Sequence, residues 1–187
     1  MVMEAGVNAI EPAAPGYTRT ARVLHWLTAA LIITMIVVGL VMGNISNGPL
    51  QNTLYTLHKS TGILLIPIIL YRLIYRLMNP PPPLPADIPA IQKLAAEGLH
   101  WGFYAILIAQ PIIGWIATSA YRAPLPFFWL FELPPIAAEN RAFSEQAFAV
   151  HRALGILLAF LISGHVAAAL FHHFVRKDNV LMRMVRG

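Results

Sequence analysis

The fold is decided by residues 147–174, which read AFAVHRALGILLAFLISGHVAAALFHHF. Arg152 is the only charged residue in this run. A helix needs about 20 predominantly apolar residues to cross the hydrocarbon core of a bilayer. The run therefore predicts a transmembrane helix, which is followed by the basic tail RKDNVLMRMVRG.

Three further apolar runs precede it, at about residues 23–43, 54–77 and 99–120. The first run is too long for the core of a signal peptide, and no small-residue cleavage site follows it, so we expect it to remain as an anchor. Four crossings and their connections account for nearly all of the 187 residues. The sequence thus predicts one all-α domain over residues 18–187, an integral membrane four-helix bundle.

The connections between these runs are polar or rich in proline. Residues 1–17 lack periodicity and are expected to form a disordered N-terminal tail. Residues 44–52 form a short turn, and the prolines of residues 79–89 favour an extended linker, because proline cannot continue a helix. The long loop of residues 121–146 contains Pro, Phe and Trp, and we expect it to lie along the membrane surface without forming a soluble domain.

The composition limits the classes of function. Hydrophobic residues make up 58% of the chain and charged residues 11%, which is typical of a protein in lipid. There is no cysteine, so disulfides, iron–sulfur clusters, thiolate-bound metals and thiol catalysis are excluded. The net charge is +5, but Lys and Arg stand singly at the ends of apolar runs without a basic aromatic patch, which favours lipid headgroups over nucleic acid as the partner.

The distribution of Lys and Arg predicts the orientation, because basic residues near helix ends are retained in the cytoplasm. Both termini lie on one side of the predicted bundle, together with nine basic residues: Arg19, Arg22, Arg72, Arg76, Lys93, Arg176, Lys177, Arg183 and Arg186. Four lie on the other side: Lys59, Arg122, Arg141 and Arg152. Both termini are therefore expected in the cytoplasm.

Four histidines fall inside the apolar runs or at their first turn, where an unpaired polar ring is costly: His25, His58, His151 and His165. His165 follows His151 by 14 positions, a rise of about 21 Å, and lies within about 40° of four full helical turns. The two rings thus share a face at two depths. Depth then pairs His25 with His165 on the cytoplasmic side, and His58 with His151 on the outer side.

Two histidine pairs at two depths suit two haems, each held by an imidazole on both faces. His58 and His151 each stand four positions before a glycine, Gly62 or Gly155, which leaves room for a porphyrin or a neighbouring helix. The cations that follow these histidines, Lys59 and Arg152, are candidates for contacts with haem propionates. Arg22 is the corresponding candidate at the inner site.

Other interpretations of the histidines stay open. An intramembrane histidine also serves as a hydrogen-bonding residue between helices, and four of them also suit a proton relay or a zinc site. A zinc site, however, needs its ligands at one depth and carboxylate partners that the apolar runs lack. His100 opens the third run on the inner side and is a rival to His25, but we expect it to face the lipid headgroups beside Trp101. We expect His172 and His173 to cap a quinone site or to be interfacial.

Five segments resemble the bacterial di-haem cytochrome b561 family of the inner membrane. They are LHWLTAALI (residues 24–32), LHKSTGILLI (57–66), YRLIYRLMNPPPPLP (71–85) and the C-terminal HRALGILL and GHVAAALFHHFVRKDNVLMRM (151–158 and 164–184). The resemblance covers residues 17–187, and its ligand motifs fall on the same four histidines. It implies a four-helix membrane fold, two haem b groups and ubiquinone as the electron acceptor.

A member of this family is a superoxide oxidase, so the resemblance implies electron transfer from superoxide, or another small outer-side donor, to ubiquinone. Under this hypothesis Lys59 and Arg152 have the catalytic role of attracting the anion. Related four-helix cytochromes are membrane subunits of dehydrogenases and hydrogenases, so a partner dehydrogenase is the alternative. A non-redox transporter or metal binder is the third.

Overall fold

Four long helices make up most of the computed structural model, which describes residues 16–187. They are α1 (Arg19–Met42), α2 (Pro49–Met78), α3 (Ala90–Ala120) and α4 (Arg141–Phe171), and each is long and apolar enough to cross a membrane. Large apolar side chains cover their outer surfaces; Phe160, for example, is 73% exposed. The predicted all-α membrane bundle is confirmed, and such an exterior requires lipid as its solvent.

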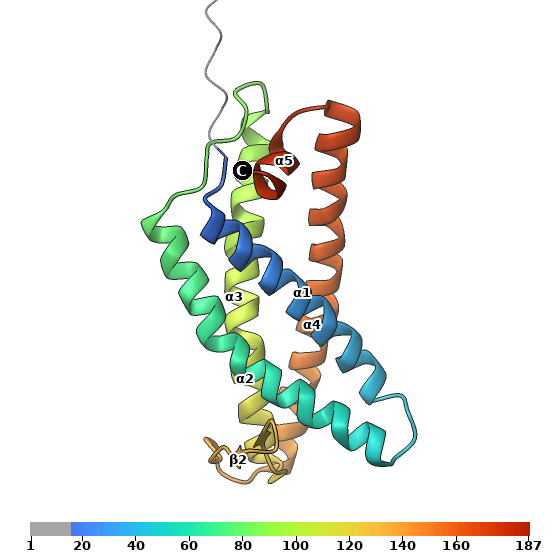
Figure 1. The fold of residues 1–187 in the computed structure, drawn as a ribbon. Helices are drawn as coiled ribbons and strands as arrows, with labels where there is room; N and C mark the ends of the chain where they lie inside the picture. Colours follow the sequence, from blue (N-terminus) through green and yellow to red (C-terminus); the bar gives the residue numbers. More distant parts are fainter. Residues whose placement is uncertain (1–15) are drawn as a thin grey trace, which may run out of the picture.

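Consecutive helices run in opposite directions, so α1 and α3 begin at the end of the molecule where the C-terminus lies (Figure 1). Helix α2 packs on α1 and α3, and α4 packs mainly on α3. A central apolar cluster joins all four helices through Ile32, Leu65, Ile69, Leu107 and Leu158. Within the described chain, α4 packs closely on neither α1 nor α2, which are the helices that carry the other two predicted histidine ligands.

All four helices begin earlier than the apolar runs predict, and α1 starts at Arg19 instead of about Val23. Helix α2 starts at Pro49 instead of about Leu54, because proline suits the first turn of a helix. Helix α3 starts directly after Pro89, nine positions before the predicted Leu99. Helix α4 starts at Arg141, where the Asn140 side chain accepts a hydrogen bond of 3.0 Å from the Phe143 N–H. Hydropathy marks the part of a helix that lies in lipid, whereas these helices continue beyond it.

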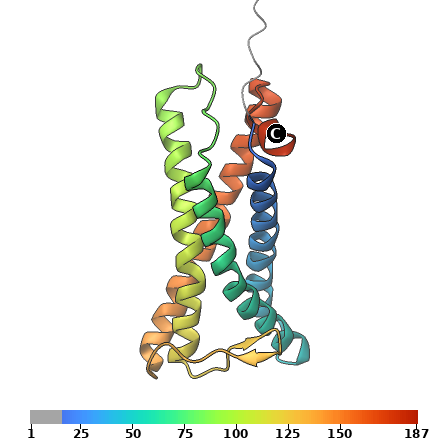
Figure 2. The same ribbon diagram turned by 60° about the vertical axis from the view of Figure 1, so that its left-hand side comes forward.

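The connection between α3 and α4 folds into a small hairpin at the end of the bundle away from the C-terminus, which is the predicted outer end (Figure 2). Strands β1 (Pro126–Phe127) and β2 (Phe131–Glu132) are antiparallel. Ser60 of α2 is fully buried beneath them, where its hydroxyl donates to the Pro126 carbonyl (2.9 Å) and accepts from the Phe128 N–H (2.8 Å). The hairpin is therefore fixed to α2.

The C-terminal tail, for which the sequence analysis predicted no secondary structure, folds back onto the end of the bundle that is predicted to be cytoplasmic. A π-helical turn, η1 (His172–Arg176), follows α4, and Lys177 in the left-handed region leads to the short helix α5 (Val180–Val185). The buried Arg183 donates to the Pro83 carbonyl (2.6 Å), and the Trp26 indole donates to the Met184 carbonyl (3.1 Å). Helix α5 is thereby held against α1 and the proline-rich segment.

The predicted disordered tail, residues 1–17, lies outside the described residues except for Gly16 and Tyr17. The Tyr17 N–H donates to the Arg183 carbonyl (3.3 Å). Burial raises the pKa of the Tyr17 hydroxyl, although nearby arginines oppose this shift. The chain immediately before α1 is thus in contact with α5.

Candidate functional site: two histidine pairs

Helix α4 presents one histidine near each end of the bundle, and a second histidine lies opposite each of them. His151 faces His58 of α2, with ring centroids 6.1 Å apart. His165 faces His25 of α1, with ring centroids 6.2 Å apart. The structure brings together the two pairs that the depth argument predicts, on the uninterrupted helix that the argument requires.

The separation within each pair fits a single metal ion between two imidazoles. Histidine nitrogen binds metals at about 2.0–2.1 Å and lies about 1.1 Å from the ring centre, so two ligating rings on opposite sides of an ion have centroids about 6 Å apart. Both pairs span helices that have few or no backbone contacts with each other, which leaves room for a macrocycle between the rings. Among residues 16–187, no group of three or more His, Asp or Glu residues is placed to hold a metal ion.

The outer pair is surrounded by the backbone of neighbouring helices. A Cβ atom added at Gly39 of α1 would lie 3.1 Å from His58 Cε1, and one at Gly114 of α3 would lie 3.3 Å from His151 Cε1. The Nδ1 atom of His151 donates to the Gln110 carbonyl (3.1 Å), which leaves Nε2 for a metal. The outer rings therefore fit against their neighbours only because these two positions lack side chains.

Sequence reasoning missed Gly39 and Gly114, although a signal was present. Gly39 follows His25 by 14 positions, and Gly114 follows His100 by the same interval, which also separates His151 from His165. At about 3.6 residues per turn, this interval keeps two residues on one helix face at two depths. A glycine at that spacing from an inner histidine marks where an outer ring packs.

The two glycines that the sequence singled out contact neighbouring side chains. A Cβ atom at Gly62 would lie 3.7 Å from the Met35 Cε, and one at Gly155 would lie 3.3 Å from the Gln110 amide nitrogen. That nitrogen donates to the His151 carbonyl (3.1 Å). Both glycines thus allow a neighbouring helix to approach, and their contact with a porphyrin stays a prediction.

The inner pair is surrounded by side chains. Arg72 of α2 donates from Nη2 to His25 Nδ1 (2.9 Å), and its guanidinium also lies 5.7 Å from the centre of the Tyr104 ring. The His165 ring lies 5.6 Å from the Phe103 ring. Arg72 was predicted only to lie on the same side of the bundle as the termini, and the apolar pattern gave no indication of its contact with His25.

The prediction that His100 faces the headgroups is wrong. Its ring is partly buried and lies 5.6 Å from that of His165, centroid to centroid. Helix α3 starts well before the apolar run, so His100 lies on its third turn and not at its end, where it turns towards α4. Three histidines therefore meet at the inner site.

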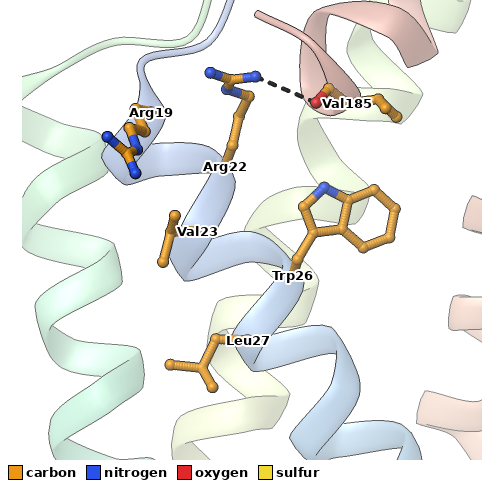
Figure 3. Close-up of a pocket in the computed structure, with 6 residues that line it drawn as sticks. All are labelled: Arg19, Arg22, Val23, Trp26, Leu27 and Val185. Carbon is orange, nitrogen blue, oxygen red and sulfur yellow. Dashed lines mark hydrogen bonds between the residues drawn. The ribbon is translucent and has the colours of Figure 1, made fainter.

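The cations predicted to serve the sites have different surroundings. Lys59 donates to the Pro124 carbonyl (2.6 Å) and so supports the hairpin, whereas Arg152 is exposed. Arg22 donates to the Val185 carbonyl of α5 (3.2 Å), as Figure 3 shows. The contacts of these three residues with haem propionates stay predictions.

His172 and His173 belong to the C-terminal turn. His172 Nδ1 donates to Asp178 Oδ2 (2.6 Å), and the His173 ring packs on the Phe174 ring. Asp178 also accepts from the Arg176 side chain and the Val180 N–H. Burial alone raises the pKa of Asp178, but these hydrogen bonds outweigh burial and hold the pKa below its usual value.

Comparison with known proteins agrees with this geometry. The chain matches the family described as prokaryotic cytochrome b561 over residues 16–187. It is 36% identical to cytochrome b561 homolog 2 of Escherichia coli, over 86% of each chain. It is 32% identical to the probable superoxide oxidase CybB of Yersinia pestis, over 87% of this chain and 91% of that protein. It is 29% identical to cytochrome b562 of Cereibacter sphaeroides, over 92% of this chain and 96% of that protein.

The family, the four spans and the histidine pairs agree on one class of protein. The chain is a multi-pass bacterial membrane protein, and its family name implies haem b. It belongs to the prokaryotic cytochrome b561 family of transmembrane electron-transfer proteins.

Proposed function

We propose that this cytochrome is a superoxide oxidase of the bacterial inner membrane, which passes electrons from superoxide on the outer side to ubiquinone. The observation that carries the proposal is the placement of two histidine pairs, 6.1 and 6.2 Å between ring centroids, near opposite ends of one bundle. His58 and His151 would hold one haem b, and His25 and His165 the other. Haem supplies reversible one-electron chemistry at its iron.

The overall reaction balances with two protons from water as the only further reactant. Two superoxide anions each lose one electron and become two molecules of oxygen, while one ubiquinone gains two electrons and two protons and becomes ubiquinol. The chain contributes axial nitrogens, burial that excludes water, and charge at the outer surface. Similarity to a probable superoxide oxidase of Yersinia pestis supports this choice of donor.

The charges of the outer face support an anionic donor. Arg122 lies 3.6 Å from Glu139 and Arg141 lies 3.5 Å from Glu145, so these cations are partly neutralised by carboxylates. Lys59 and Arg152 form no ion pair within residues 16–187 and directly follow the two outer histidines. They are therefore the cations best placed to attract superoxide to the outer pair.

The purified protein, reconstituted in liposomes with ubiquinone, tests the proposal. Superoxide generated outside the liposomes should produce ubiquinol at a rate that depends on haem loading, and superoxide dismutase should suppress it. Liposomes that carry the His58→Ala, His151→Ala double variant are the control and should produce none. Full haem loading with no superoxide-dependent ubiquinol would contradict the proposal while leaving the family assignment intact.

A membrane subunit of a larger dehydrogenase is the second candidate. The observation in its favour is the apolar tip of the outer hairpin, where Trp129, Leu130 and Phe131 are 61%, 75% and 55% exposed. A partner protein on the outer face would cover such a surface. Co-purification of a stoichiometric dehydrogenase from native membranes would favour this candidate over a stand-alone oxidase.

A further inference from the structure

We propose that the cytoplasmic ends of α1 and α5 form a binding site for one anionic phospholipid. A hollow of about 490 Å³ opens there, beside the first two turns of α1 (Figure 3). Its lining consists of Arg19, Arg22, Val23, Trp26, Leu27 and Val185. This inference concerns a ligand other than haem, superoxide or quinone and does not depend on the proposed function.

The lining residues from α1 form one face of that helix, and this face changes from basic to apolar along its length. They lie at intervals of three and four, which places them in a single stripe. The two arginines stand in the first turn, and the apolar members, Val23, Trp26 and Leu27, follow in the direction of the membrane interior. From Arg19 to Leu27 the helix rises about 12 Å. The stripe therefore offers cations at headgroup depth and an apolar wall at the depth of the upper acyl chain.

Helix α5 completes the site. Arg22 donates to the Val185 carbonyl (3.2 Å), and Trp26 donates to the Met184 carbonyl (3.1 Å), so two residues of the stripe hold α5 beside it. Val185 then forms part of the wall. A bound lipid would contact both helices and would stabilise the folded-back C-terminal segment.

The positive charge of the two arginines favours an anionic ligand. Neither Arg19 nor Arg22 forms an ion pair in the described chain, and the buried Nε of Arg22 has no hydrogen-bond partner there. The C-terminal Gly187 lies against the Arg22 guanidinium, where an added Cβ atom would be 3.0 Å from Cζ, so Arg19 is the more open of the two cations. By contrast, Arg176 at the same end is paired with Asp87 and Asp178. A phosphodiester next to two guanidinium groups would satisfy them, and basic pockets on the cytoplasmic side of membrane proteins bind such headgroups. A neutral quinone ring would leave both charges unpaired.

Native mass spectrometry of the haem-loaded protein, titrated with lipid, measures the site directly. Phosphatidylglycerol should bind more tightly than phosphatidylcholine of the same chain length. Each arginine replaced by glutamine should weaken phosphatidylglycerol binding about fivefold, and the Arg19→Gln, Arg22→Gln variant should lose the preference between the lipids. Lys177→Gln removes one exposed charge from the same end of the protein but outside the lining, and it should bind like the wild type.

Further measurements separate this proposal from its rivals. Leu27→Ser should weaken binding of both lipids, and glycerol phosphate, which has no acyl chain, should not compete. Arg19→Gln alone tests the charge if the double variant proves unstable, because the exposed Arg19 side chain forms no described hydrogen bond or ion pair.

Four results would overturn the proposal. They are equal affinity for the two lipids in the wild type, unchanged affinity in the arginine variants, displacement of phosphatidylglycerol by a soluble ubiquinone analogue, and loss of haem from Arg22→Gln.

Discussion

The two ends of the bundle hold their histidine pairs by different means. At the outer end, the rings of His58 and His151 lie against backbone at Gly39 and Gly114, and a backbone carbonyl at Gln110 fixes one ring. At the inner end, side chains surround the pair: Arg72, His100, Phe103 and Trp26. A site formed by backbone is determined by helix packing, whereas a site formed by side chains can be altered residue by residue. We therefore expect the outer site to be sensitive to added volume and the inner site to changes of polarity and charge.

Replacing a histidine should have the largest effect, and each replacement should affect only the pair to which that histidine belongs. His58→Ala or His151→Ala should remove only the outer haem, and His25→Ala or His165→Ala only the inner one, because each iron loses an axial nitrogen. A pyridine haemochrome assay should give about one haem per chain instead of about two, and redox titration of the spectrum should identify the haem that remains.

His100→Ala is the matched control for the inner pair. His100 lies as close to His165 as the proposed ligands lie to each other, yet it should leave both haems in place. Loss of the inner haem from His100→Ala and its retention in His25→Ala would mean that His100 is the true partner of His165. Loss of the same haem from His25→Ala and His151→Ala would refute the pairing by depth.

The second-largest effect should come from adding a single methyl group at the outer site, which should leave the inner site unchanged. In Gly114→Ala the new Cβ would lie 3.3 Å from His151 Cε1, closer than most such contacts, so the ring or helix α3 must shift. Overpacking of this kind costs about 1–3 kcal/mol. We expect the outer haem to be bound more weakly, and the inner haem to be unaffected, in absorption spectra recorded during thermal denaturation.

Gly98→Ala makes the same change in the same helix, at an exposed position where a Cβ atom meets nothing within 4 Å. It should leave both haems as stable as in the wild type. Equal destabilisation by the two variants would show that α3 tolerates no added volume at all, and that backbone contact with His151 has no special role.

The sequence predicted the part of the architecture that depends on hydropathy and helical periodicity. Four spans, both termini on one side and the two histidine pairs all follow from apolar runs and from the rise per residue. The starts of all four helices were misplaced because a helix does not stop where the lipid stops. Asn140 and Pro49, which mark two of these ends, are recognisable only as local capping signals.

The contacts around the rings could not be predicted, because they depend on how far each helix is rotated about its axis. Arg72 was placed only on the side of the termini and His100 at the headgroups, but helix rotation directs them towards His25 and His165. The fold of the C-terminal tail was also not predicted. Its helix, α5, has only six residues, and its position depends on hydrogen bonds to distant residues such as Trp26 and Pro83.

Removing the charge of Asp178 should destabilise the C-terminal turn at the inner end and leave the outer end unchanged. The pKa of Asp178 is held below its usual value by hydrogen bonds from His172, Arg176 and the Val180 N–H, so its carboxylate stabilises the C-terminal turn. For a depressed pKa, this contribution is present above the unfolded pKa of about 3.9 and is lost as the pH falls through the folded value. Asp178→Asn should remove the contribution at neutral pH.

Hydrogen exchange of residues 178–185 measures this effect. Protection in Asp178→Asn should fall about fivefold or more, as expected for the loss of hydrogen bonds to a charged group, and should no longer depend on acid. Asp87→Asn, which removes only the contact of a 72% exposed carboxylate with Arg176, should have a smaller effect. If the hairpin at residues 122–139 lost protection to the same extent, the two ends would not be independent.

The smallest expected effect concerns the approach of superoxide to the outer pair. Replacing both Lys59 and Arg152 by Gln should slow haem reduction by superoxide several-fold at low ionic strength, and the difference should diminish as salt screens the charges. Haem content should be unchanged, and so should oxidation of the reduced protein by a soluble quinone analogue. The Arg122→Gln, Arg141→Gln variant is the control, because it removes the same charge from the same face at residues that already face Glu139 and Glu145.

The comparison between the two double variants decides how the outer face acts on an anion. If local placement guides superoxide, the variant next to the histidines should be slower than the control, although both have the same net charge. Equal slowing would assign the effect to the net charge of the whole face. Equal losses in superoxide oxidation and quinone reduction would mean that Lys59 and Arg152 chiefly secure haem propionates or, through the contact of Lys59 with Pro124, the hairpin. A rate that neither substitution nor salt changes would exclude electrostatic guidance and would favour a partner protein as the donor, at the same end where the apolar hairpin is exposed.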